Sequence, residues 1–112
     1  MVTIYHNPHC SNSRRALDVI RAAGIEPEII EYLKTPLSEA QLRGLVERLG
    51  QPLRSLVRDN EPLFAELGLA DANEAELFAA VAAHPVLLNR PIVVSEKGAK
   101  LCRPGDQAAS LL

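Results

Sequence analysis

The chain has 112 residues, of which 47% are hydrophobic and 23% are charged, a composition typical of one globular domain with a single core. Twelve Lys and Arg residues against 14 Asp and Glu residues give a formal net charge of −2, which argues against broad nucleic-acid or membrane binding. The start of the chain lacks the pattern of a signal peptide, and no apolar run approaches the ~20 residues of a membrane span.

The first third of the chain predicts a strand–helix–strand unit. Val2–Tyr5 is β-branched and aromatic and is followed by a turn-forming Asn-Pro pair, which predicts a short strand and a turn. Apolar residues at helical spacing from Ser13 onward predict a helix that ends at Gly24. Glu28–Leu33 suits a second short strand. Because a helix joins them, the two strands should be parallel.

The middle of the chain is predicted to be helical. Ser38 is followed three residues later by a glutamine, the capping-box pattern that opens a helix, and Gly50 is placed to end it. Asn73, with a glutamate three residues on, opens another helix in the same way. Two shorter helical segments are expected between them, at Leu53–Val57 and Leu63–Leu67.

The last third returns to strand patterns. Pro91–Val94 and Ala99–Cys102 predict a hairpin, and a Pro-Gly-Asp turn at 104–106 predicts a short final helix. We therefore predict an α/β fold of the thioredoxin plan, with a four-stranded mixed sheet in the order βαβ…ββα. A single domain over residues 1–112 is expected, with an all-helical insertion at about 36–84.

Cys10 stands where the first predicted strand meets the first predicted helix. Unpaired backbone N–H groups and the helix dipole at that point favour a thiolate and also bind oxyanions. His6, if protonated, or Arg14 would favour the anion further. An ordinary lone cysteine is more often a small buried hydrophobe, but the surroundings of this one are polar, turn-forming and cationic.

Cys10 and Ser13 form a C-x-x-S arrangement, in which serine takes the place of the second redox cysteine. Such a site forms no local disulfide, so it predicts one-thiol chemistry with an external resolving thiol. Cys102, the other cysteine, lies far away in the sequence, which does not resemble a secreted disulfide framework. We expect a cytoplasmic protein with reduced thiols.

Three arginines lie at the edges of apolar elements, where they could bind an anion. Arginine is permanently charged and forks onto tetrahedral oxyanions with paired hydrogen bonds. Each would be an ordinary surface residue if taken alone, but two of them precede a proline. A thioredoxin-like fold places a cis-proline opposite the active cysteine, and a cis Pro91 would put Arg90 beside Cys10. The three candidates are Arg58, Arg90 and Arg103.

Five segments in unbroken order resemble the ArsC family, and more closely its glutaredoxin-coupled arsenate reductases. They are HNPHCSNSR (6–14), EYLKTPLSEAQLRGLVERLG (31–50), LVRDNEPLFAELGLA (56–70), HPVLLNRPIVV (84–94) and KLCRPGD (100–106). The motifs H-N-P-x-C-x-x-S-R and N-R-P-I-V-V are each specific enough that a chance occurrence is rare. The resemblance implies a thioredoxin-like fold that reduces arsenate to arsenite, with glutathione as co-substrate, glutaredoxin as partner, and no metal or bound cofactor.

The resemblance also assigns roles by position. Cys10 matches the nucleophile that forms a covalent thiol–arsenate intermediate, and His6 matches the histidine thought to lower its pKa. Cys102 matches a cysteine that the family does not need for catalysis. The residues matched to oxyanion binding are Arg58, Arg90 and Arg103. The supporting residues are expected to be Asn7, Ser13, Arg14 and Pro91.

Two other functions remain open from the sequence. Spx-type proteins of the same family bind RNA polymerase and sense oxidation, but they typically carry C-x-x-C, where this chain has Ser13 in place of the second cysteine. The full set of arginines also favours an enzyme. A glutathione-linked thiol reductase with another substrate would use the same chemistry, because an oxyanion pocket by itself does not identify arsenic.

Overall fold

The computed structural model describes residues 1–112 and contains two compact units. One unit comprises Met1–Thr35 and Arg90–Leu112, and the other comprises Pro36–Asn89. The second unit corresponds to the helical insertion that the sequence predicts at about 36–84, and it extends to Asn89. Val57 and Leu88 form an isolated antiparallel bridge that ties the end of this unit back to its interior. Every helix is too short or too polar to span a lipid bilayer.

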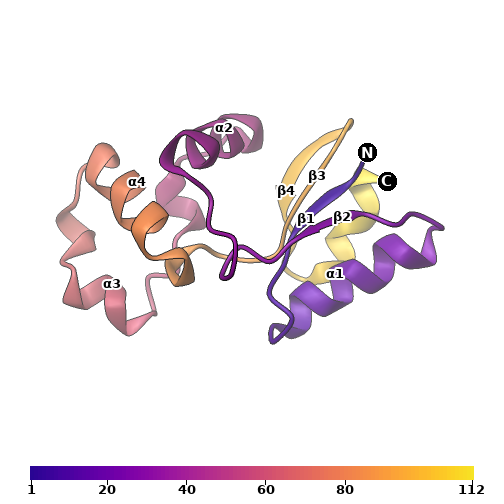
Figure 1. Ribbon diagram of the computed structural model, residues 1–112, viewed down its shortest axis with the longest axis horizontal. Coiled ribbons are helices and arrows are strands. Elements are labelled where there is room, and N and C mark those ends of the chain that lie inside the picture. Colours follow the sequence, from indigo (N-terminus) through magenta and orange to yellow (C-terminus); the bar gives the residue numbers. More distant parts are fainter. The chain divides into compact units, whose positions relative to one another are not determined.

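The first unit contains a four-stranded mixed sheet in the order β2-β1-β3-β4 (Figure 1). Its central strand β1 (Thr3–Tyr5) pairs in parallel with β2 (Glu28–Ile30) and antiparallel with β3 (Ile92–Ser95), which pairs antiparallel with β4 (Gly98–Leu101). The four-stranded mixed sheet predicted from the sequence is confirmed, with strand ends that differ by at most three residues.

Helix α1 (Ser11–Ala22) and the C-terminal 3-10 helix (Gly105–Leu111) pack together on one face of this sheet (Figure 1). Gly24 lies in the left-handed region with φ of 81°, as its place after the helix predicts. The short final helix that the sequence predicts is present as a 3-10 helix. The buried cluster between the helices and the sheet consists of Val2, Ile4, Ala16, Leu17, Ile20, Val93, Cys102, Ala108 and Leu111.

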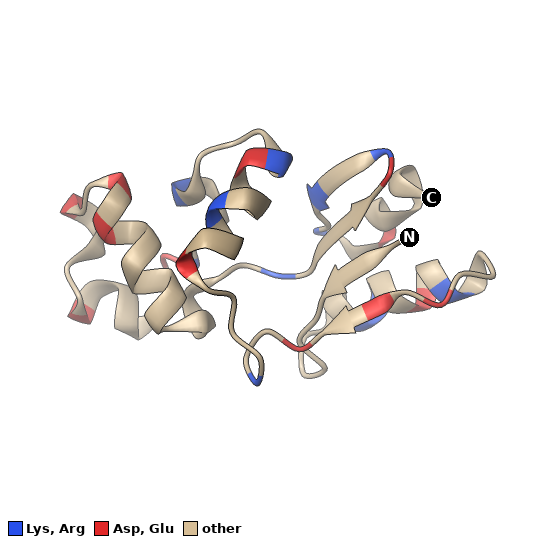
Figure 2. Cartoon of the chain, turned by 45° about the horizontal axis from the view of Figure 1, so that its top comes forward, with Lys and Arg blue, Asp and Glu red and all other residues tan.

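The second unit is helical, with α2 (Glu39–Leu49), α3 (Pro62–Glu66) and α4 (Glu74–Ala83) joined by short 3-10 turns. Both predicted capping boxes are present, one at Ser38 and one at Asn73. Residues 59–89 include six Asp and Glu residues and no Lys or Arg, and α3 and α4 accordingly carry red but no blue in Figure 2. This stretch therefore offers no lysine or arginine side chain that could bind an anion.

The parallel pair β1–β2 offers a direct test of how burial sets stability. Ile4 and Ile29 are register partners, but Ile4 is fully buried whereas Ile29 is 36% exposed. We expect Ile4→Val to lower the free energy of unfolding by about 1 kcal/mol, because it removes a buried methyl group. The same change at Ile29 should lower it by less than about 0.5 kcal/mol. Urea denaturation of both full-length variants measures the difference, and equal losses would contradict this description of the core.

Candidate active site

Cys10 occupies the N-cap of α1, with an extended backbone at φ −95° and ψ 123°. Its own N–H donates to the Asn7 carbonyl at 3.0 Å, and its carbonyl accepts the N–H of Arg14 at 3.0 Å, the first bond of the helix. No side-chain hydrogen bond caps the helix. The backbone N–H groups of Ser13 and Asn12 act instead on the Cys10 sulfur and favour its anion.

Two arginines from the C-terminal half of the unit act on this sulfur, Arg103 by a contact and Arg90 by its charge. Arg103 Nη1 lies 3.8 Å from Cys10 Sγ and also donates to the Arg90 carbonyl at 2.8 Å. The charge of Arg90 acts on Cys10 as well. The Arg90–Pro91 peptide bond is cis, the geometry that the sequence analysis tied to Arg90 lying beside Cys10. The fold therefore brings together a thiol and two guanidinium groups more than 75 residues apart in sequence.

The balance of these effects lowers the pKa of the Cys10 thiol below its ordinary value. Burial, with 7% of the residue exposed, would raise the pKa on its own. The N–H of Ser13, the charge of Arg90, the N–H of Asn12 and the hydrogen bond from Arg103 together outweigh it. Cys10 is therefore a more acidic thiol than an ordinary cysteine, beside the Arg103 guanidinium and within the field of Arg90.

His6 is joined to this site through Ser13. His6 Nδ1 and Ser13 Oγ are 2.6 Å apart, and the N–H of Asn7 donates to the same oxygen at 3.0 Å. Both His6 and Ser13 are buried. Burial lowers the pKa of His6, so its ring is neutral at neutral pH. His6 therefore serves as a hydrogen-bond partner that holds the Ser13 side chain.

The sequence predicts Arg90 beside Cys10, and Arg90 and Arg103 are the cations that lower the pKa of Cys10. It also predicts that His6, if protonated, or Arg14 favours the anion, but the groups that lower this pKa do not include them. A buried imidazole loses its proton more readily, and the Arg14 guanidinium donates instead to the Pro8 carbonyl at 2.9 Å. Neither fact is visible in the local sequence.

Cys102 is a free thiol of the opposite kind. It is fully buried in the core of the first unit, and its sulfur lies 3.5 Å from the Lys100 carbonyl. Burial raises the pKa of Cys102 to about 11. The thiol therefore stays protonated at neutral pH, and a protonated thiol is a poor nucleophile.

Arg58, the third predicted anion-binding arginine, lies in the helical unit. Its backbone N–H donates to the Leu87 carbonyl at 2.8 Å, and its Nη1 donates to the Val86 carbonyl at 3.4 Å. Its Nη2 pairs with Glu61 Oε2 at 3.4 Å, and its Nε is buried without a hydrogen-bond partner. The structure thus brings Arg90 and Arg103 to Cys10, and it places Arg58 in the other unit.

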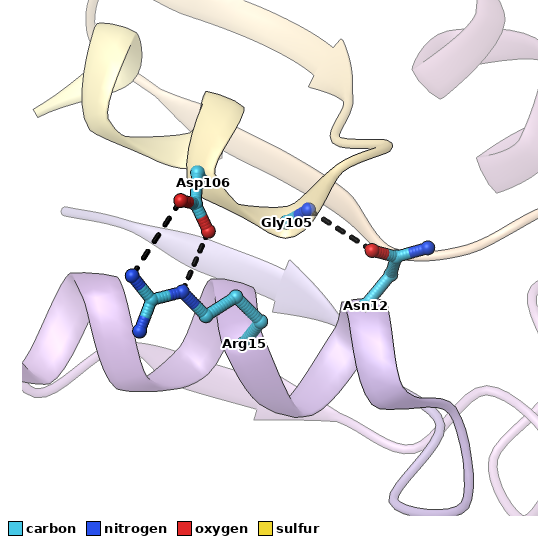
Figure 3. Close-up of polar contacts among 4 residues, drawn as sticks. All are labelled: Asn12, Arg15, Gly105 and Asp106. Atoms are coloured by element: carbon cyan, nitrogen blue, oxygen red, sulfur yellow. Dashed lines mark hydrogen bonds and ion pairs between the residues drawn. The ribbon is translucent and has the colours of Figure 1, made fainter.

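A set of contacts between α1 and the C-terminal turn is not predicted by the sequence (Figure 3). Asn12 Oδ1 accepts the N–H of Gly105 at 3.3 Å, and Arg15 Nε pairs with Asp106 Oδ1 at 2.6 Å. The one local signal is the glycine after the Arg103–Pro104 pair, which by itself predicts only the opening of a helix. Such a glycine also permits close approach of two backbones.

The arrangement combines a nucleophile with an anion site. The Cys10 thiolate can attack an electrophilic centre, while Arg90 and Arg103 neutralise negatively charged oxygens on it. No three His, Cys, Asp or Glu side chains gather where they could hold a metal ion. Cys10 with Arg90 and Arg103 can carry out the chemistry of one thiol acting on an oxyanion.

This fold and site define a thioredoxin-like α/β protein with a single reactive thiol at the mouth of its first helix. The model of the ArsC family matches residues 5–111, and the chain belongs to this family. It is 47% identical over 113 residues to an arsenate reductase of Rhizobium meliloti (strain 1021), covering 99% of this chain and 81% of the relative. It is 46% identical over 113 residues to an arsenate reductase of Escherichia coli, covering 99% and 80%. A solved arsenate reductase from Vibrio cholerae matches with a TM-score of 0.95 and 43% identity, covering 99% and 97%.

The two thiols should differ sharply in reactivity. Since only the thiolate reacts, the iodoacetamide rate of Cys10 should rise with pH around a midpoint below the ~8.5 of an ordinary cysteine. Arg103→Ala should move this midpoint upward, and His6→Ala should move it less, because the His6 ring is neutral. Cys102→Ser serves as the control and should leave the profile unchanged. A midpoint at the ordinary value in the parent protein would contradict the described site.

Proposed function

We propose that the protein is an arsenate reductase that converts arsenate to arsenite in the cytoplasm. Glutathione is its co-substrate, glutaredoxin is its partner, and no metal or cofactor is bound. Identities of 47% and 46% to two arsenate reductases support the substrate. The C-x-x-S arrangement of Cys10 and Ser13 supports the reductants, because a site without a second cysteine needs a thiol from another molecule.

One contact carries the proposal: the 3.8 Å approach of Arg103 Nη1 to Cys10 Sγ at the N-terminus of α1. Arsenate is a tetrahedral oxyanion with an electrophilic centre. It therefore needs a thiolate directed at arsenic and cations directed at the oxygens, and Cys10 with Arg90 and Arg103 supplies both. The guanidinium groups also offset the repulsion between a thiolate and an anionic substrate.

The first step is a substitution without electron transfer. The Cys10 thiolate attacks arsenic, an S–As bond forms, and an As–O bond breaks. The departing oxygen takes up protons and leaves as water, so arsenic remains As(V) in the covalent adduct. Arg90 and Arg103 hold the oxygens that remain on arsenic.

The second step transfers the electrons. The thiol of glutathione attacks the Cys10 sulfur, and the electron pair of the S–As bond passes to arsenic, which leaves as arsenite, As(III). Cys10 and glutathione are thereby oxidised to a mixed disulfide. A thiolate of glutaredoxin then attacks the glutathione sulfur, becomes glutathionylated, and releases the Cys10 thiolate.

The test is NADPH oxidation in a mixture of this protein, glutathione, glutaredoxin and glutathione reductase. We expect oxidation that depends on both arsenate and the protein. Cys10→Ser should reduce it to background, and the matched variant Cys102→Ser should retain most of it. Arsenate-independent reduction of a glutathione mixed disulfide would point to the alternative of a thiol reductase with another substrate. Equal losses in both cysteine variants would indicate a Cys10–Cys102 disulfide cycle.

The arginines should control catalytic efficiency. Loss of a hydrogen bond to a charged group costs about 1.5–3 kcal/mol, and ~1.4 kcal/mol corresponds to a tenfold change in rate. Arg90→Ala and Arg103→Ala should therefore each lower kcat/KM by about ten- to a hundredfold. Lysine at either position should recover only part of the lost kcat/KM, because it keeps the charge but loses the forked hydrogen bonds. The role of Arg58 rests on the family resemblance, and Arg58→Ala tests it in the same assay. Arg43→Ala, on the exposed face of α2, is the control; parent-like activity in all the site variants would refute the oxyanion site.

A further inference from the structure

Gly105 lies directly against the backbone at the start of α1. A Cβ at this position would be 2.7 Å from the Ala16 nitrogen and 2.9 Å from Arg15 Cβ, and closer still to the Asn12 carbonyl oxygen. Since side chains do not approach a backbone so closely, only glycine fits there. This contact fixes the distance between the C-terminal turn and the first turns of the helix.

Two polar contacts flank the glycine and set the orientation of the turn (Figure 3). Asn12 Oδ1 accepts the Gly105 N–H at 3.3 Å. The Arg15 guanidinium forks onto the Asp106 carboxylate, with Nε to Oδ1 at 2.6 Å and Nη2 to Oδ2 at 3.5 Å. Both side chains of this ion pair are more than half exposed, so the pair contributes little to stability. A forked pair does, however, fix the angle between the two groups that it joins.

The residues of this contact adjoin the reactive groups on both sides. Cys10 lies two residues before Asn12 on one side, and Arg103 lies two residues before Gly105 on the other. Gln107 Nε2 donates to the Arg103 carbonyl at 3.2 Å, which ties Arg103 further to the C-terminal turn. A shift of the turn along α1 would therefore move the Arg103 guanidinium relative to the sulfur.

We propose that Asn12, Arg15, Gly105 and Asp106 form a latch that holds Arg103 within reach of the Cys10 sulfur. Arg15 and Asp106 are then positioning residues of the site, although neither touches the thiol. The latch acts on the thiol and its cation, so the inference holds whether or not arsenate is the substrate.

Because Asp106 is charged, an experiment can distinguish its role in the latch from the direct electrostatic effect of its carboxylate on Cys10. A carboxylate repels the thiolate, so removing it would lower the pKa of Cys10 if only the field mattered. Releasing the latch would instead loosen Arg103 and raise the pKa of Cys10. The two explanations predict shifts of opposite sign for Asp106→Ala.

The experiment measures the pH profile of Cys10 alkylation by iodoacetamide in a Cys102→Ser background. Asp106→Ala should raise the midpoint by about half a unit, which slows alkylation about threefold at a pH below the midpoint. Glu26→Ala is the matched control, because Arg21 and Glu26 form a similar forked and exposed pair at 3.1 and 3.0 Å at the other end of α1. Its midpoint should stay unchanged. The double variant Arg15→Asp with Asp106→Arg should restore the parent profile.

Gly105→Ala should raise the midpoint further and lower the free energy of unfolding, because the turn must move away from α1. If this variant does not fold, Asp106→Ala and its charge-swapped rescue still decide the question. A lowered or unchanged midpoint in Asp106→Ala would overturn the latch. An equal rise of the midpoint in Glu26→Ala would also overturn the latch, since the loss of any ion pair on α1 would then have the same effect on Cys10.

Discussion

At the start of α1 the first backbone N–H groups have no acceptor within the helix, and the side chain placed before them is a thiol. A serine or aspartate at the N-cap would accept a hydrogen bond from one of these N–H groups and cap the helix. Cys10 leaves them directed at sulfur, where they stabilise a thiolate. The helix rests on the sheet through Ala16 and Ile20, so the position of the anion is set by the core of the first unit.

Burial alone does not decide what a cysteine does in this protein. Cys10 is 7% exposed and Cys102 is fully buried, yet the pKa of Cys10 is lowered while that of Cys102 is raised to about 11. The difference lies in what surrounds each sulfur. Cys102 is packed among apolar side chains, whereas Cys10 has two guanidinium groups and two helix N–H groups to stabilise its charge. The same fold thus keeps one thiol inert and the other ready to react.

Two guanidinium groups beside one sulfur repel each other, and the fold has to hold them there. The Arg103 guanidinium donates to the Arg90 carbonyl at 2.8 Å, so the segment that carries one arginine also anchors the other. A thiolate relieves part of the repulsion, and an oxyanion relieves more of it. The site is therefore arranged for an anion before one arrives, and this agrees with the membership of the chain in the ArsC family.

The sequence by itself determined the features that depend on neighbours within about four residues. The apolar run of β1, the capping boxes at Ser38 and Asn73, and the cysteine before a helix were all predicted and are all present. Only the tertiary structure decided that Arg90 and Arg103, and not His6 or Arg14, are the cations that lower the pKa of Cys10. It also decided which part of α1 accommodates Gly105. The physical reason is that residues 103–106 approach residues 10–15 only when segments some 90 residues apart pack together. The spacing of apolar residues within one segment carries no information about which distant segments pack together.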